Sequence, residues 1–226
     1  MSAIRRQLLS ALAATRPPRD LQAEARLAVA GQLPPDLEPV EPSRAAAVLL
    51  PIVDRPEGAG LLLTCRSDHL PDHPGQICFP GGGREPGDPD LAATALRETE
   101  EEVGIGPHQV RICGYLPAHL TITGFAVAPV VGLVSPYYRA RPDAREVAEI
   151  FEMPLEHALD PGNHHRESRS FRGQQVRYWV IHWQDYRVWG ATAAMIVSLA
   201  GMVASPNPAD GTAGPGEGDG DKKVPE

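Results

Sequence analysis

The sequence has few cysteines, no long hydrophobic run and a deficit of basic residues, and each shortage excludes a class of protein. The three cysteines, Cys65, Cys78 and Cys113, are widely spaced and form no Cys-x-x-Cys pair. They predict neither a disulfide framework nor a zinc site, so we expect reduced thiols in the core. No apolar stretch reaches the roughly 20 residues that span a bilayer. The formal net charge of −8 argues against nonspecific binding to nucleic acid, which needs a basic surface.

The length and composition predict one folded domain with extensions at its ends. A chain of 226 residues, of which 42% are hydrophobic, can bury one good core, and no internal repeat is visible. We place an N-terminal helical extension at 1–35, the main domain at 36–204 and a disordered acidic Gly/Pro tail at 205–226. The first 19 residues hold four arginines and no acid, as a transit peptide can. We prefer a short amphipathic helix that uses Ile4, Leu8, Leu9 and Leu12.

Residues 79–105 are the most informative segment, because they join a glycine-rich loop to a helix with clustered carboxylates. The loop is Phe79-Pro80-Gly81-Gly82-Gly83, and the helix includes Arg97-Glu98-Thr99-Glu100-Glu101-Glu102. Asp88 predicts the N-cap and Pro89 the first turn, while Gly104 supplies a left-handed stop. At roughly 100° per residue the helix has two stripes. The apolar stripe is Ala92, Leu96, Thr99 and Val103, and the acidic stripe is Glu98, Glu101 and Glu102.

The acidic stripe favours a site for a hard divalent cation. Like charges at i, i+3 and i+4 cost a few tenths of a kcal/mol per pair, and Arg97 can pair with Glu101 but cannot offset all three acids. Mg²⁺ takes such oxygen ligands together with substrate phosphates. Consecutive glycines expose N–H groups that bind phosphate oxygens. Alone, the acidic stripe could be a solvated helix face and the glycine loop a simple turn. Their succession in the sequence predicts a diphosphate-and-metal site.

This succession resembles the Nudix box. Gly83 and the run Arg97–Ile105 match its spacing, whereas Pro89 stands in place of the first glutamate and Thr99 in place of an aliphatic residue. In Nudix proteins that glutamate helps to hold the loop against the helix and the box arginine, and Asp88 or Asp90 could substitute. The resemblance implies an α/β fold, a Nudix-type α/β/α sandwich with a mixed β-sheet.

A second resemblance, to the coenzyme A pyrophosphatase branch of that family, lies upstream. Its main runs are Leu62-Leu63-Thr64-Cys65-Arg66-Ser67-Asp68-His69-Leu70, His73-Pro74-Gly75-Gln76-Ile77 and Phe79-Pro80-Gly81-Gly82. Further likeness lies in Glu146-Val147, Phe151, Pro154-Leu155 and Trp189-Gly190-Ala191-Thr192. This branch also lacks the first box glutamate and carries aspartates nearby, so Pro89 fits it.

The resemblance assigns roles to individual residues. Glu98 and Glu102 would be the main metal ligands, Glu101 a further ligand or the partner of Arg97, and a glycine carbonyl near Gly82 would complete the shell. Arg97 and Gly104 would be structural parts of the motif.

An acid outside the box would ligate metal or act as the catalytic base, for which Glu146 and Glu149 are candidates. The alternative is that both lie on the wet face of a strand. We expect substrate contacts from the backbone of Gly81 and Gly83. The 3′-phosphate of coenzyme A needs a basic group, so the remaining substrate-binding candidates are Arg66, Arg84 and His73, each of which has a structural or solvent-exposed alternative.

The coarse pattern predicts a sheet with helices near 89–103 and 190–203. We expect strands at Ala46–Ile52, Gly60–Cys65, Val110–Leu116, Ala126–Val134, Glu146–Met153 and Val176–Trp183. Residues 156–175 indicate a polar excursion. Strands interrupted and followed by helices suggest a mixed sheet covered on both sides.

The resemblance implies hydrolysis of coenzyme A or acyl-CoA to 3′,5′-ADP and 4′-phosphopantetheine or its acyl derivative, with Mg²⁺ or Mn²⁺ as cofactor. Alternatives are hydrolysis of another nucleoside diphosphate derivative, and a non-catalytic nucleotide sensor, which Pro89 motivates. The expected partner is this small-molecule substrate, with no nucleic acid and no membrane, and a homodimer is left open. The chain ends in Val224-Pro225-Glu226 rather than a peroxisomal Ser-Lys-Leu, so we expect a cytoplasmic location.

Overall fold

A mixed eight-stranded sheet forms the centre of the molecule. The computed structural model describes residues 3–29, 40–71, 73–171 and 173–204, so the disorder expected for 205–226 lies outside them. The strands are β1 (Arg44–Arg55), β2 (Gly58–Arg66), β3 (Ile77–Cys78), β4 (Gly81–Gly83), β5 (Val110–Tyr115), β6 (His119–Leu120), β7 (Phe125–Val134) and β8 (Val147–Pro154). Their order is β3-β2-β1-β7-β5, with β4 on β1, β6 on β7 and β8 on β2. The pair β1 and β7 is parallel, and the other pairs are antiparallel.

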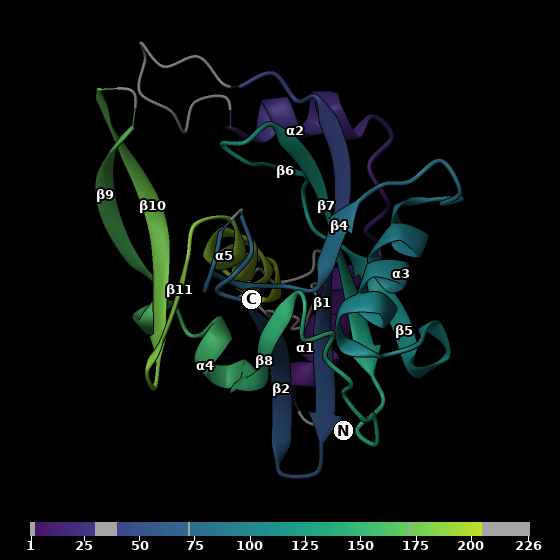
Figure 1. Ribbon diagram of the computed structural model, residues 1–226. Helices are drawn as coiled ribbons and strands as arrows, with labels where there is room; N and C mark the ends of the chain where they lie inside the picture. The colour runs from purple at the N-terminus through teal and green to yellow at the C-terminus, as the bar shows by residue number, and fades with distance from the viewer. Residues whose placement is uncertain (1–2, 30–39, 72, 172, 205–226) are drawn as a thin grey trace, which may run out of the picture.

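Helices cover both faces of this sheet, as a sandwich requires. They are α1 (Ala3–Leu12), α2 (Leu21–Val29), α3 (Leu91–Val103), α4 (Leu155–Leu159) and α5 (Ala191–Ala204). In strand β1, Leu49 packs with Ala95 of α3, whereas Leu50 packs in the cluster that contains Leu8 of α1 and Ile196 of α5. Figure 1 shows α3 and α5 on opposite sides of β1. The expected sandwich with a mixed sheet is confirmed.

The N-terminal helix α1 belongs to the main core. The side chains of Leu8 and Leu12 are 0% and 1% exposed, and they pack in one cluster with α5 and the sheet. After the helix, the Thr15 hydroxyl accepts a hydrogen bond of 2.9 Å from the backbone N–H of Tyr115 on β5. The amphipathic helix is therefore present, and it is fastened to the sheet.

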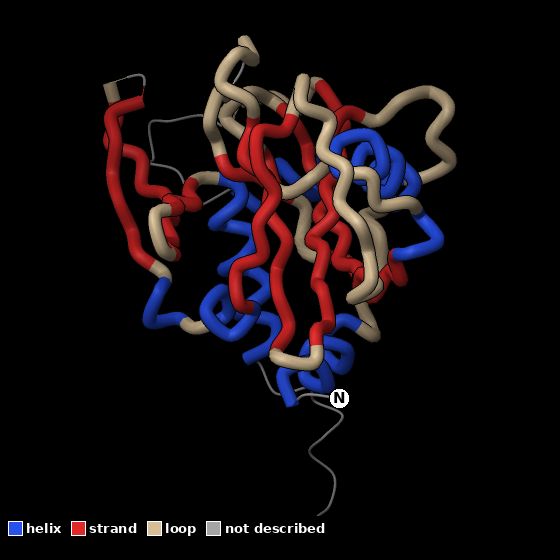
Figure 2. Tube along the Cα trace, turned by 60° about the horizontal axis from the view of Figure 1, so that its bottom comes forward, coloured by secondary structure: helices blue, strands red, loops and turns tan. Residues whose placement is uncertain are grey.

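A second sheet stands beside the first and includes part of 156–175, where the sequence predicted a polar excursion and no strand. It has three antiparallel strands, β9 (His165–Phe171), β10 (Gln174–Trp183) and β11 (Tyr186–Trp189), in the order β11-β10-β9. Figure 2 shows it at the left of the molecule. Strand β9 carries charged residues that find aromatic partners on β10, and the Arg166 guanidinium carbon lies 3.8 Å from the ring centre of Trp179. Pairing of this kind gives a polar segment a strand conformation without apolar alternation.

The cysteines are free thiols at partly buried positions. Among the described residues no helix is long and apolar enough to cross a membrane.

Candidate active site

Helix α3 begins two residues later than the sequence suggested. Its N-cap is Asp90, whose backbone is extended and whose carboxylate accepts a 2.8 Å hydrogen bond from Ala93 N–H. The prediction of Asp88 as N-cap and Pro89 in the first turn is therefore wrong. The Asp88 carboxylate is engaged elsewhere, because it accepts hydrogen bonds from the Thr94 hydroxyl and from Arg97. The left-handed stop at Gly104 is confirmed, with φ at 73°.

Arg97 fastens the glycine loop to the helix. Its Nε and Nη2 donate to the two Asp88 oxygens at 3.0 and 3.1 Å, and Nη2 also donates to the Gly83 carbonyl at 3.0 Å. Its Nη1 reaches Glu98 at 2.9 Å and Glu101 at 3.2 Å, so the expected pair with Glu101 is present. The Asp88 carboxylate, and not that of Asp90, therefore holds the arginine in this chain.

Glu98 and Glu102 lie directly against the backbone of the glycine loop. The Gly81 N–H donates to Glu102 Oε2 at 3.1 Å. A Cβ atom placed on Gly82 would lie 2.5 Å from the Glu98 carboxyl carbon, so only glycine admits this approach. Gly81 itself has φ at 154°, and a Cβ there would lie 2.4 Å from the Ala47 carbonyl oxygen.

The three box carboxylates do not share one face, which corrects the two expected stripes. Glu102 is only 5% exposed and is buried on the side that carries Thr99 and Val103, whereas Ala92 and Leu96 are partly exposed. The Glu101 side chain is 59% exposed and turned to Arg97. The loop backbone, which a helical wheel leaves out, covers Glu102 and provides its hydrogen-bond partner.

Burial dominates the electrostatics of the two inner carboxylates. It raises the pKa of Glu102 to about 8, with smaller contributions from the negative charges of Glu98 and Glu146, against the Gly81 N–H and Arg66. Burial likewise raises the pKa of Glu98. A divalent cation would favour the charged form of both groups. No group of three acidic, histidine or cysteine side chains converges among the described residues. Two carboxylates nevertheless suit Mg²⁺, which proteins often hold by one or two of them with substrate phosphates.

The structure separates the two candidate acids outside the box. Glu146 precedes β8 and is exposed, and its charge acts on both Glu98 and Glu102. Glu149 lies on β8, opposite Cys65 of the neighbouring strand β2. Its carboxylate accepts a 2.6 Å hydrogen bond from the Tyr186 hydroxyl. The Tyr186 ring stacks on Phe151, which belongs to the core on the α5 side of the sheet. Glu149 therefore lies on the face away from α3.

The expected substrate contacts are also distinguished. Arg66 acts electrostatically on Glu102, and its buried Nε has no hydrogen-bond partner among the described residues. Arg84 donates to the Asp88 carbonyl at 3.3 Å and so braces the loop. His73 is exposed on the loop after β2, in a left-handed conformation with φ at 56°. Of these three side chains, only that of Arg66 acts on the pKa of Glu102.

Sequence reasoning missed two residues near the site, Ser67 and Asp143. Ser67 is 3% exposed, and its N–H donates to the Glu146 carbonyl at 2.9 Å. The N–H of Asp143 donates to the Glu102 carbonyl at 2.9 Å. Both bonds join segments far apart in the chain, so local sequence carried no signal for them.

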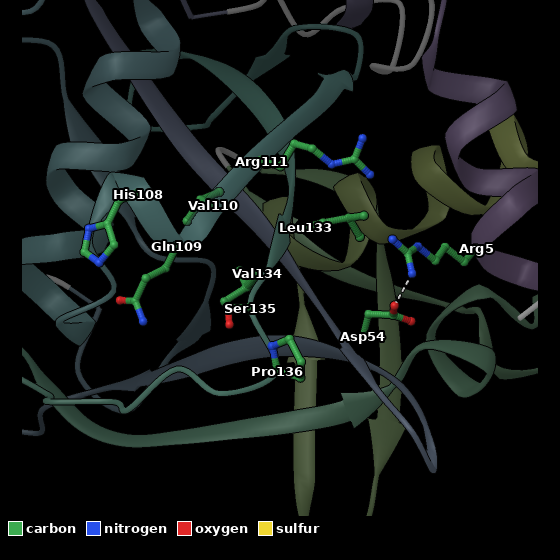
Figure 3. Close-up of a pocket in the computed structure, with 10 residues that line it drawn as sticks. All are labelled: Arg5, Asp54, His108, Gln109, Val110, Arg111, Leu133, Val134, Ser135 and Pro136. Atoms are coloured by element: carbon green, nitrogen blue, oxygen red, sulfur yellow. Dashed lines mark hydrogen bonds and ion pairs between the residues drawn. The ribbon is translucent and has the colours of Figure 1, made fainter. Parts of the chain in front are cut away.

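A cavity of about 290 Å³ lies elsewhere, where the parallel strands β1 and β7 end. It is lined by Arg5, Asp54, His108, Gln109, Val110, Arg111, Leu133, Val134, Ser135 and Pro136. Figure 3 shows the ion pair of Arg5 with Asp54 at its side. None of these residues belongs to the carboxylate and glycine-loop site.

Comparisons with known proteins identify the family of this chain. The family model described as NUDIX domain matches residues 43–174. The chain is 48% identical over 157 residues to proteins named Uncharacterized Nudix hydrolase NudL from Enterobacter sp. (strain 638) and Escherichia coli O1:K1 / APEC, covering 70% of this chain and 81% of each relative. These names state no substrate.

Two solved structures are similar to parts of the chain. An Ap4A hydrolase binary complex of C. elegans is similar with a TM-score of 0.45 at 23% identity, over 50% of this chain and 83% of that one. The Nudix hydrolase RenU of M. smegmatis has a TM-score of 0.43 at 21% identity, over 53% and 78%.

A mixed sheet between helices, with a glycine loop fastened to a carboxylate-bearing helix, is the arrangement of a phosphoanhydride hydrolase. The chain belongs to the Nudix family of hydrolases. Members of this family generally use divalent metals such as Mg²⁺ or Mn²⁺.

Proposed function

We propose that this Nudix hydrolase cleaves the diphosphate bond of coenzyme A or acyl-CoA to 3′,5′-ADP and 4′-phosphopantetheine or its acyl derivative. One observation carries the hydrolytic part. Glu98 and Glu102 lie together against the backbone of Gly81 and Gly82, and burial raises the pKa of both. Such a pair suits a cation that neutralises a diphosphate.

Glu98 and Glu102 would hold Mg²⁺ or Mn²⁺, with the Gly82 carbonyl as a further ligand. When bound, the cation neutralises charge on the diphosphate oxygens. Glu101 is the partner of Arg97 in this proposal and not a metal ligand, because its side chain is mostly exposed and faces the arginine. Arg97 holds the glycine loop against the helix through its hydrogen bonds to Asp88 and to the Gly83 carbonyl.

Glu146 is the better candidate for the base that takes a proton from the attacking water. Its charge acts on both inner carboxylates, so it lies near the place where the diphosphate would bind. Glu149 is bound to Tyr186 on the other face of the sheet. We therefore expect Glu146→Gln to lower kcat strongly and Glu149→Gln to leave it within a factor of about two.

The assignment of coenzyme A rests on the resemblance of 62–82 to the coenzyme A branch, supported by the placement of Arg66. The Arg66 guanidinium, whose charge acts on Glu102, can donate to a phosphate oxygen of the substrate. The exposed His73 lies on the loop that follows Arg66 and is a candidate for contact with the rest of the substrate. We also propose a cytoplasmic location for the enzyme.

A second candidate is hydrolysis of another nucleoside diphosphate derivative, such as a sugar nucleotide or a dinucleotide. The carboxylate site would serve any of these, because it addresses only the diphosphate. A third candidate, a non-catalytic nucleotide sensor, was motivated by Pro89. Asp88 accepts two hydrogen bonds from Arg97, so the loop is held without the first box glutamate. Pro89 is therefore no argument for a non-catalytic protein.

A substrate comparison tests the proposal. Purified protein is incubated with Mg²⁺ or Mn²⁺ and, in parallel, coenzyme A, 3′-dephospho-coenzyme A, a sugar nucleotide and a dinucleotide, and products are separated by chromatography. We expect 3′,5′-ADP from coenzyme A and a lower kcat/KM for the dephospho substrate. A preference for the sugar nucleotide or dinucleotide would contradict the coenzyme A assignment. Binding of all four without turnover would favour the sensor.

A further inference from the structure

The segment Arg141–Glu146, here called the strap, crosses the end of helix α3. The N–H groups of Arg141 and Asp143 donate to the carbonyls of Val103 and Glu102 at 2.8 and 2.9 Å. These two carbonyls belong to the last turn of the helix. Carbonyls of the last turn have no hydrogen-bond partners within a helix. Gly104 permits the crossing, since a Cβ there would lie 2.7 Å from the Arg141 Cβ. The strap is therefore fixed to the residue that carries the buried carboxylate Glu102.

The other side of the strap is fixed to Ser67, the residue directly after strand β2. The Ser67 hydroxyl donates to the Ala144 carbonyl at 3.2 Å, and its N–H donates to the Glu146 carbonyl at 2.9 Å. Ser67 is buried, so an unsatisfied carbonyl here would be costly. Within the strap, the Asp143 carbonyl accepts from the N–H groups of Glu146 and Val147.

Asp143 also organises the turn with its side chain. Its carboxylate accepts a 2.9 Å hydrogen bond from the Arg145 N–H and pairs with the Arg145 guanidinium. The residue thus joins three parts, because its N–H reaches α3, its carboxylate holds Arg145 and its carbonyl holds Glu146. Glu146 itself is exposed, so bonds to its neighbours and not burial decide where it lies.

We propose that Ser67 and Asp143 are positioning residues, which fix the strap so that the Glu146 carboxylate stands beside Glu98 and Glu102. This inference rests on the proposed role of Glu146 as the base. It explains how an exposed acid keeps a defined place relative to the box helix. The electrostatic action of Glu146 on both Glu98 and Glu102 agrees with that place.

A double-mutant cycle between Ser67 and Glu146 tests the inference. Ser67→Ala removes the bond to the Ala144 carbonyl, and we expect kcat to fall about tenfold with KM changed less than about twofold. In the Glu146→Gln background the same substitution should change kcat less than about twofold, because the group that it positions is already inactive. Asp143→Ala should behave in the same way, with a loss of kcat that also disappears in Glu146→Gln.

Thr15→Ala is the matched control. It removes a hydroxyl that likewise donates to a carbonyl, that of Leu12 at 2.7 Å, and accepts from Tyr115, but at the N-terminal segment. It should lower the unfolding temperature about as much as Ser67→Ala while kcat is unchanged. If kcat fell only because stability is lost, it would fall equally in both variants. A positioning role lowers kcat in Ser67→Ala alone.

The inference is overturned if the effects of Ser67→Ala and Glu146→Gln on kcat multiply, or if Ser67→Ala raises KM alone. Hydrolysis is measured on a diphosphate substrate that the wild type turns over. Failure of the coenzyme A assignment would therefore appear in the wild type, as preference for another substrate. Failure of the positioning inference would appear only in the comparison between variants.

Discussion

Arg97 donates two parallel hydrogen bonds to the Asp88 carboxylate, Nε to Oδ1 at 3.0 Å and Nη2 to Oδ2 at 3.1 Å. Asp88→Asn replaces one acceptor by an N–H that faces the guanidinium. We expect the free energy of unfolding at neutral pH to fall by about 2 kcal/mol, because the Arg97 guanidinium loses its bidentate charged partner. Activity should fall as well, since the glycine loop is no longer held. Denaturant unfolding and an initial-rate assay measure the two effects.

The same pair has a defined pH dependence. The hydrogen bonds from Arg97 hold the pKa of Asp88 well below its usual value. Its contribution to stability is therefore present above the ordinary aspartate pKa of roughly 4 and is lost as pH falls through the lowered value. Asp90→Asn is the control, because asparagine caps helices as well as aspartate. Equal losses in the two variants would contradict the assignment of Asp88 as the anchor.

Gly82→Ala should reduce activity without unfolding the protein. The added methyl group would overlap the Glu98 carboxyl group, the flexible end of a side chain, so Glu98 moves and the fold remains. We expect the unfolding temperature to stay within a few degrees and kcat to fall at least tenfold, since the carboxylate of one proposed metal ligand is displaced. Gly87→Ala, where a Cβ meets nothing within 4 Å, should leave both values unchanged. Full activity of Gly82→Ala would remove Glu98 from the site.

Glu102→Gln should stabilise the metal-free protein at high pH. Burial raises the pKa of Glu102 to about 8 in the folded state, so the wild type loses stability as pH rises from the usual glutamate value through about 8. The amide cannot ionise, and above pH 8 the variant should be more stable by on the order of 2 kcal/mol, or about 4–8 °C in unfolding temperature. Mg²⁺ should raise the unfolding temperature of the wild type more than that of the variant.

The exposed Glu100→Gln on the same helix is the control for this measurement. It should show neither the gain at high pH nor a weaker response to Mg²⁺. A Glu102→Gln variant less stable than wild type above pH 8 would contradict the raised pKa.

The N-terminal helix should contribute to the stability of the whole domain. Leu8 is fully buried against α5 and the sheet, so Leu8→Ala should cost about 2–5 kcal/mol in unfolding free energy. Leu27→Ala on α2, whose side chain is 72% exposed, should cost less than about 0.5 kcal/mol. Urea denaturation compares the two. Similar small losses would show that α1 is not part of the cooperative core.

The elements that the sequence predicted are those with a strong local signal. The apolar runs at 46–52 and 126–134 identified β1 and β7, and Gly104 identified the end of α3. Strands β3, β4 and β6 have two or three residues, too few to show a period. Strand β9 carries charged residues whose stabilising partners lie on β10, so its own sequence could not reveal it.

The candidate site also has features that local sequence predicted and features that depend on contacts between distant segments. The spacing of Glu98 and Glu102 along a helix is local, and the structure brings both to the glycine loop. The burial of Glu102 and the choice of Asp88 over Asp90 depend on contacts across the loop. The separation of Glu146 from Glu149 depends on which face of the sheet each reaches, and Tyr186, far along the chain, binds only the latter.

The rate of 3′,5′-ADP formation from coenzyme A in the presence of Mg²⁺ or Mn²⁺ tests the central claim most directly. Wild type and Glu102→Gln are compared, with Gly87→Ala as a variant that should match the wild type. We predict product from wild type and Gly87→Ala, dependent on the added metal, and a loss of at least a hundredfold in Glu102→Gln. A folded wild type that forms no product with either metal, or a Glu102→Gln variant of equal activity, would contradict the claim.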